Sequence, residues 1–284
     1  MSKQSIKAIR QVLRRVQSHL IQSHLNLGAQ LESVGFVDVI YHQTSTLPHL
    51  NYITPRQKTA WIPTPEIEKG LNQLREHGRT PRVYYIEGLF PPLFAKALHD
   101  LDLKIEREIP IMTCALQPPS PKLQPLPDGI RIERVTDQEG IAQWWYVWRN
   151  ARFDVITGGV EPLYVGRDMR ELIIGNQADF ILYRYGFPVG VARLTINNQS
   201  ANLTALSIMK EARTEENVRL LRQAAQSFAI ERGCDLIFTS GETEADRRLC
   251  RQMGFVDSGS VVCYAQTSQQ EETHDMAEST FMLF

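Results

Sequence analysis

The sequence predicts a mixed α/β fold, with helices on a mixed sheet, that is divided into two domains. The length of 284 residues suits two domains of ordinary size better than one. Five prolines between residues 116 and 129 indicate a stiff, extended spacer. Helical and strand-like patterns then follow in a similar order on both sides of that spacer. We therefore expect domains at residues 1–115 and 130–265, a linker at 116–129 and a polar tail at 266–284.

The composition excludes several classes of function. Lysine and arginine number 31 against 32 aspartates and glutamates, so no global charge draws the chain to nucleic acid or to anionic lipid. The first residues contain no apolar run of signal or membrane-spanning length, which favours a cytoplasmic protein. Four dispersed cysteines predict free thiols, and no histidine lies between Leu101 and Thr273, so we expect no metal site there.

The first half begins with helical spacing between Ser5 and Leu31, which hides any early strand. Its apolar side, from Ile6 to Leu20, packs on its own domain or forms a homodimer seam. The following periodicities and breakers predict a strand at 50–54, a helix at 64–77, a strand at 82–87, a helix at 92–101 and a strand at 103–113.

The second half shows a longer series of elements. Alternation and helical spacing predict strands at 130–135, 179–185, 189–196, 201–208 and 235–239, with helices at 137–152, 168–174, 214–232 and 243–253. Residues 255–264 read as a hairpin-like pair around Ser258-Gly259-Ser260. The stretches RVYYIEG and DLIFTSG each precede a helix and a strand, which indicates an internal duplication.

This element order resembles the GCN5-related N-acetyltransferase (GNAT) family. LTALSIMKEARTEENVRLLRQAAQSFAIERGCDLIF is similar to the family's central strand, acyl-CoA loop, helix and next strand, and ADRRLCRQMGFVDSG is similar to its late helix. The resemblance covers residues 130–265, with fainter echoes earlier. It implies two GNAT-like domains in tandem, of which the first is degenerate.

The resemblance also implies where acetyl-CoA binds. A backbone N–H near Ile208 polarises the thioester carbonyl, and the pyrophosphate rests on the start of the helix at Thr214. Arg213 matches the first position of the family's loop motif. Glu216 and Val218 stand where that motif has glycines, and a carboxylate there repels phosphate unless Arg213 and Arg219 offset it. Alternatively, the glutamates of this turn face outward and favour the helix dipole without any ligand.

The same resemblance implies two catalytic candidates. Cys250 stands where the family often has a tyrosine that protonates the thiolate, although a buried core cysteine is the commoner role. Glu242 follows a predicted strand at a place where a carboxylate can take a proton from an amine, and an exposed loop glutamate is the alternative.

Three tryptophans within five residues form the remaining candidate. Trp144 and Trp148 share a helix face, and Arg149 lies beside them. In the resembled fold this helix borders the acceptor pocket, so the group forms either an aromatic wall with a carboxylate-binding arginine or ordinary core.

We therefore expect a cytoplasmic acetyltransferase that moves an acetyl group from acetyl-CoA to an amine of a small molecule or peptide, without a metal. The competing hypothesis is a non-catalytic binding or assembly module with the same fold. Its use of the apolar Phe281–Phe284 in docking is one interpretation of the tail, and a frayed end is the other.

Overall fold

The structure is a computed structural model, and it describes residues 3–57, 59, 61–118, 125–154 and 162–266. The described chain forms two compact units. Unit 1 contains residues 3–112 and 257–266, and unit 2 contains the residues from Thr113 to Val256. The apolar tail residues 281–284 lie outside the described residues.

Unit 1 is built on a mixed sheet with the strand order β1-β2-β3-β4-β11-β5. Its strands are β1 (Gln30–Val34), β2 (Val37–Tyr41), β3 (Tyr52–Pro55), β4 (Arg82–Ile86), β11 (Val256–Ala265) and β5 (Lys104–Ala115). β1, β2 and β3 are antiparallel neighbours, and β3 is parallel to β4. The last strand of the chain, β11, pairs antiparallel with β4 from Val261 opposite Ile86 to Ala265 opposite Arg82.

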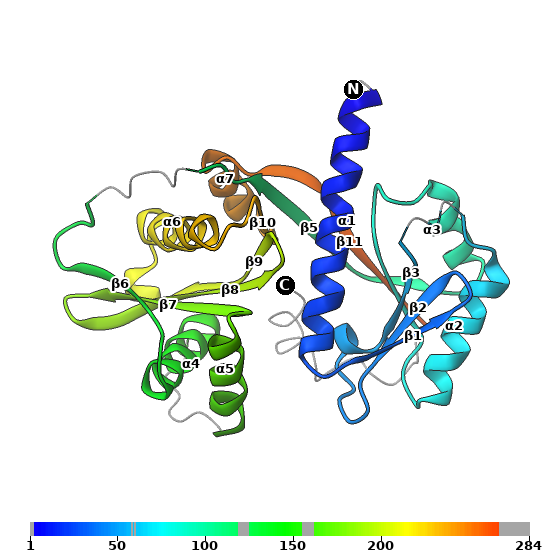
Figure 1. The fold of residues 1–284 in the computed structure, drawn as a ribbon, viewed down its shortest axis with the longest axis horizontal. Coiled ribbons are helices and arrows are strands. Elements are labelled where there is room, and N and C mark those ends of the chain that lie inside the picture. Colours follow the sequence, from blue (N-terminus) through cyan, green and yellow to red (C-terminus); the bar gives the residue numbers. More distant parts are fainter. Residues whose placement is uncertain (1–2, 58, 60, 119–124, 155–161, 267–284) are drawn as a thin grey trace. The chain divides into compact units, whose positions relative to one another are not determined.

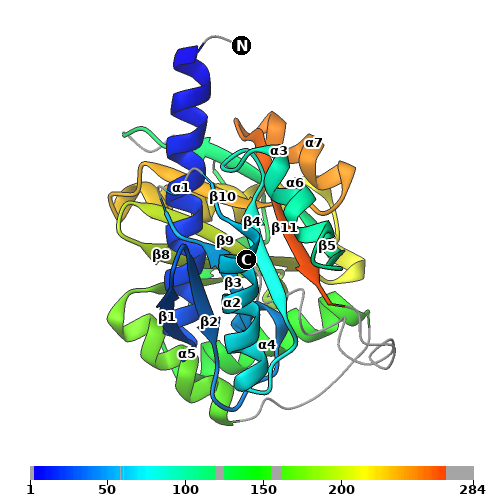
Figure 2. The same ribbon diagram turned by 90° about the vertical axis from the view of Figure 1, so that its right-hand side faces the viewer.

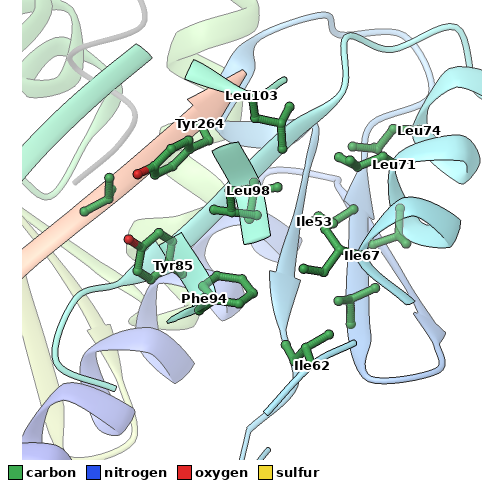
Figure 3. Close-up of a cluster of buried hydrophobic side chains, with 14 of the residues drawn as sticks. Ile53, Ile62, Ile67, Leu71, Leu74, Tyr85, Phe94, Leu98, Leu103 and Tyr264 are labelled. Carbon is green, nitrogen blue, oxygen red and sulfur yellow. The ribbon is translucent and has the colours of Figure 1, made fainter. Parts of the chain in front are cut away.

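Helices cover both faces of this sheet (Figures 1 and 2). The helices of unit 1 are α1 (Lys3–Asn26), η1 (Pro48–Leu50), α2 (Thr64–Glu76) and α3 (Pro92–His99). Leu13 and Val16, on the apolar side of α1, are buried, and Gln17 of the same helix donates to Thr54 of β3. α2 and α3 contribute Ile67, Leu71, Leu74, Phe94 and Leu98 to a core on the other face (Figure 3). The burial of these apolar side chains holds the unit together.

Unit 2 has the strand order β10-β9-β8-β7-β6. These strands are β6 (Ile130–Arg134), β7 (Gln177–Arg184), β8 (Phe187–Asn197), β9 (Ser200–Ile208) and β10 (Leu236–Ser240). β6 to β9 are antiparallel neighbours, whereas β9 and β10 are parallel. The end of β5 runs beside β10, where Leu116 N–H donates to the Asp235 carbonyl at 2.8 Å.

The helices of unit 2 lie on opposite faces of its sheet: α4 and α5 cover one face, and α6 and α7 cover the other (Figure 1). Their bounds are α4 (Gln138–Phe153), α5 (Pro162–Ile174), α6 (Glu215–Glu231) and α7 (Glu244–Gln252), with the short η2 (Lys210–Ala212) before α6. Side chains of Asp137, Thr214 and Thr243 cap α4, α6 and α7 by accepting a backbone N–H of the first turn. Among the described residues, no helix is long and apolar enough to cross a membrane.

Two features differ from the sequence-based expectation. The hairpin β1–β2 was hidden by the helical spacing that precedes it. β11 is one continuous strand, so the predicted hairpin around Ser258-Gly259-Ser260 is wrong. Gly259 adopts φ +144° there, and a Cβ atom would lie 3.1 Å from the Glu87 carbonyl, so this glycine serves close strand packing rather than a turn. The second compact unit ends at Val256, and the expected domain boundaries stay a prediction.

Candidate functional site

The two parallel strands of unit 2 part from each other partway along β9. Their pairing runs from Ser200 opposite Leu236 to Leu203 opposite Thr239, and β10 ends at Ser240. β9 continues to Ile208 beside β8 alone. A register shift between Arg193 and Leu194 of β8 places a bulge at Thr204 of β9, where the parting begins.

Backbone groups of β9 point into the space beyond this parting. Met209 N–H donates to the Val189 carbonyl of β8 at 2.8 Å. Because hydrogen-bonding direction alternates along an antiparallel strand, the N–H groups of Leu206 and Ile208 point away from β8. The carbonyl of Ile208 points the same way and accepts from Arg213 Nε at 3.1 Å. Two N–H groups on the open side of a strand can stabilise negative charge on a carbonyl oxygen.

The start of α6 lies next along the chain. Thr214 Oγ1 accepts from the Asn217 N–H at 3.2 Å, and the Asn217 side chain donates to the Ala212 carbonyl at 2.7 Å. Thr214 and Glu216 are exposed, while Val218 is partly buried. These contacts give α6 a capped helix start that uses its own side chains.

Arg213 is held by three contacts within unit 2. In addition to the Ile208 carbonyl, its guanidinium donates to the Ala151 carbonyl at 2.9 Å and pairs with Asp154 at 2.7 Å. Its side chain remains 47% exposed, so part of its hydrogen-bonding capacity still faces solvent. The arginine therefore links the end of α4 to the end of β9, the strand that extends beyond its pairing with β10.

The other charges of this helix start are distributed over its surface. Glu215 pairs with Arg248 of α7, and both side chains are largely exposed. Arg219 is partly buried one turn further along α6. Because exposed pairs contribute little, these residues shape the local charge more than the stability.

The two catalytic candidates have different environments. Glu242 is exposed in the loop between β10 and α7. Cys250 is fully buried in α7. A carboxylate at Glu242 can exchange protons with water directly, whereas a thiol at Cys250 has no exposed surface.

The tryptophans form a buried stack on α4. Trp144 is 0% exposed and Trp148 6%, and their parallel rings lie 6.4 Å apart between centroids. The indole N–H of Trp144 donates to the Ala192 carbonyl at 3.0 Å. Arg149 lies 6.0 Å from the Trp145 ring centroid and is partly exposed. The ring of Trp144 thus belongs to the interior of unit 2.

An ion network below this stack was not predicted from the sequence. Arg193 of β8 donates to both carboxylate oxygens of Asp179 at 2.8 and 2.6 Å, and to Asp168 at 2.6 Å. Asp168 also accepts from Trp145 Nε1 at 2.8 Å. Burial raises the pKa of Asp179 despite Arg193, whereas for Asp168 the effect of burial is outweighed by Arg193 and Arg167, and its pKa is lowered.

Unit 1 repeats the order strand, helix, parallel strand, helix. Between β3 and β4, Ile53 pairs with Val83. The starts of α2 and α3 border a small apolar pocket of about 50 Å³ lined by Trp61, Ile62, Phe90 and Phe94, among others. No cluster of three or more His, Cys, Asp or Glu side chains that could bind a metal occurs among the described residues.

Comparisons with known proteins support the fold of the chain. No family model and no curated protein matches the sequence. A GCN5-related N-acetyltransferase from Kribbella flavida is similar at a TM-score of 0.71 and 16% identity, covering 92% of this chain and 97% of that one.

Two further solved structures agree with that likeness. A tandem GNAT protein from the clavulanic acid biosynthesis pathway has a TM-score of 0.59 at 12% identity, covering 82% of this chain and 79% of its own. A GCN5-related N-acetyltransferase from Sphaerobacter thermophilus has a TM-score of 0.54 at 13% identity, covering 82% and 81%. At these identities the likeness concerns the fold, and the chain has a GNAT-like mixed α/β fold.

Proposed function

We propose that the chain is a GNAT-type acyltransferase whose unit 2 transfers an acetyl group from acetyl-CoA to an amine of a small molecule or peptide. The observation that carries the proposal is the parting of β9 and β10 after Leu203 and Thr239. A thioester that enters there meets the N–H groups of Leu206 and Ile208, which β8 does not use. Hydrogen bonds to the developing oxyanion lower the barrier to acyl transfer.

Other residues take supporting roles in this proposal. The free N–H groups of the first turn of α6, with Arg213, Thr214 and Arg219 nearby, bind the pyrophosphate of acetyl-CoA. Glu216 adds a negative charge to that turn and Val218 adds bulk, so the turn binds the pyrophosphate more weakly than a glycine-rich loop would. Glu242 accepts the proton of the attacking amine through water, and Arg149 holds a carboxylate of the acceptor. Cys250 has no part in this proposal, because its side chain is fully buried in α7.

Unit 1 serves as a scaffold in this proposal. Its apolar pocket next to α2 carries no charged lining residue. We accordingly place the chemistry in unit 2.

One set of contacts favours the second candidate function, a binding or assembly module without acyl transfer. Thr214 caps α6, Asp154 and two carbonyls hold Arg213, and Arg248 pairs with Glu215. These contacts pair one N–H of the first turn and the charged side chains around it without a ligand.

A titration with acetyl-CoA separates the two functions. Because a ligand that binds the native state alone raises the melting temperature, the acyltransferase predicts a saturable increase with acetyl-CoA and a smaller one for Arg213→Ala. Release of free thiol with a panel of amines then tests turnover, with Glu242→Gln as the variant. If saturating acetyl-CoA leaves the melting temperature unchanged, the binding-module function is the correct one.

A further inference from the structure

One buried guanidinium in unit 2 lacks the partners that such a group normally has. Arg222 of α6 has a side chain only 5% exposed, and among the described residues its Nε and Nη1 atoms have no hydrogen-bond partner. Buried charged groups are normally paired, since removing an unpaired charge from water is energetically costly. Arg222 therefore calls for an acceptor that the described part of the chain does not provide.

The nearest carboxylate leaves Arg222 incompletely paired. Asp246 of α7 lies 3.8 Å from Arg222 Nη2, which is beyond a good hydrogen bond. Its other oxygen accepts from Thr243 Oγ1 at 2.6 Å, so Asp246 already serves the cap of α7. Asp246 is also 44% exposed, and water screens its charge.

The side chain of Arg222 extends from α6 toward α7, where Asp246 lies. Gln226, four residues later on the same side of the helix, contacts Cys114 Sγ at the end of β5. The end of β5 runs beside the start of β10. Arg222 thus lies on the flank of α6 that faces β10 and α7. Figure 1 shows α6 and α7 on this one face of the sheet.

Unit 1 offers an internal comparison for this position. Arg222 is the eighth residue of α6, and the eighth residue of α2 is Leu71. Asp246 is the third residue of α7, and the third residue of α3 is Phe94. Leu71 and Phe94 are both buried in the apolar core of unit 1. The same positions of the two helices in unit 1 are thus apolar and buried, so this order of elements does not require a charge there.

We infer that Arg222 is the central cation of an oxyanion-binding site between α6 and α7, which takes a carboxylate or a phosphate group of a small ligand. Such a group supplies acceptors to Nε and Nη1, and its negative charge balances a guanidinium that Asp246 neutralises only in part. The site does not depend on acyl transfer, because its ligand need not be a thioester.

Inorganic phosphate and acetate are the probes that test this inference on the full chain. We expect at least one of them to shift the Nε–H resonance of Arg222 in protein labelled with ¹⁵N-arginine, and to raise the melting temperature at millimolar concentration. A response to phosphate alone assigns a phosphate ester as the ligand, and a response to acetate alone assigns a carboxylate. A response to neither overturns the inference.

The variant Arg222→Leu tests the site by replacing the cation with leucine, the residue type of Leu71 in unit 1. Its control is Arg248→Gln. Both remove one positive charge, but Arg248 is 60% exposed and lies on the surface of α7. Loss of the anion-dependent stabilisation in Arg222→Leu and its retention in Arg248→Gln support the site. An equal response of wild type and Arg222→Leu overturns it. Should Arg222→Leu not fold, the resonance of Arg222 in the wild-type protein decides.

Discussion

The guanidinium carbon of Arg193 lies 4.0 Å from the centroid of the Trp144 ring, inside unit 2. Two buried carboxylates, Asp168 and Asp179, hold the same guanidinium from its edges. A cation that is stacked on an indole and shared by two carboxylates fixes α4, α5, β7 and β8 relative to one another. This network therefore positions the helix that carries the tryptophans.

Replacing Arg193 by Met should destabilise the protein by about 3–5 kcal/mol, because it leaves two carboxylates buried without their cation. Urea unfolding followed by tryptophan fluorescence measures the change. The matched control is Arg170→Met. Arg170 is 77% exposed, and its Nε lies 4.0 Å from Glu171 Oε1, so this ion pair is long and weak. The control should change the free energy of unfolding by less than about 0.5 kcal/mol. Equal effects of both variants would show that the buried network adds no stability.

A second buried group sets the response of unit 1 to acid. His24 Nδ1 lies 2.7 Å from the hydroxyl of Tyr52, and burial lowers the pKa of His24 from 6.5 to about 3. Burial also lowers the pKa of His49, whose two ring nitrogens have no hydrogen-bond partner within the described ranges. The ring centroids of these histidines lie 5.8 Å apart, so protonating both rings would bring two buried positive charges close together and destabilise the fold.

Acid should therefore destabilise the protein well above the pH range of its carboxylates. Between pH 6.5 and about 3 the unfolded chain binds a proton that folded His24 does not. The free energy of unfolding thus decreases as the pH falls below 6.5, by about 1.4 kcal/mol per pH unit for each buried histidine. Chemical denaturation at pH 7.5, 6.0 and 5.0 measures the slope.

His49→Leu separates this effect from that of the carboxylates. The variant should flatten the slope by about 1.4 kcal/mol per pH unit. At pH 7.5 it should leave the stability unchanged or raise it, because it removes two unsatisfied buried nitrogens. His99→Gln, at an exposed position, is the control and should leave the slope as it is. An unchanged slope in His49→Leu would mean that this histidine is not buried in the neutral form.

The sequence predicted the order of elements from β6 to α7 and from α2 to β5, because these segments have clear periodicity and clear breakers. β11 was read as a hairpin because Ser258-Gly259-Ser260 is typical of a turn, and only the close approach of Glu87 explains Gly259. Pairing of β11 with β4 is a contact across the whole chain, which local pattern does not encode.

The candidate site was predicted less completely than the fold. Asp179 and Arg193 stand at alternating positions of their strands, which sequence reasoning assigns to solvent. They are buried because α4 and α5 cover that face, which is a tertiary fact. Arg222 shows the same difficulty, since a charged residue within an amphipathic helix is usually exposed. An arginine on the apolar side of a predicted helix is the signal that could have identified it.

The pair between Arg213 and Asp154 predicts how the proposed acetyl-CoA site can be strengthened. Asp154 competes with a bound phosphate for Arg213, so Asp154→Asn should lower the Kd for acetyl-CoA about two- to fivefold, as expected for a half-exposed ion pair. Asparagine tolerates the positive φ of 49° at this position. Calorimetric titration gives the Kd. Glu133→Gln removes the same charge from an exposed strand position and should have no effect, and an unchanged or higher Kd in Asp154→Asn contradicts the proposed role of Arg213.

The N–H of Leu206 allows a direct test of the proposed chemistry. Leu206→Pro removes this N–H, which does not pair with β8, and should lower kcat for acetyl transfer by about 10²–10³-fold. Leu206→Ala keeps the N–H, loses most of the side chain, and should retain turnover within a few-fold. Because proline tolerates a strand position whose N–H is unpaired, both variants should remain folded, which the melting temperature verifies. If a folded Leu206→Pro turns over as fast as Leu206→Ala, the oxyanion is stabilised elsewhere, and the parted strands are not where the thioester reacts.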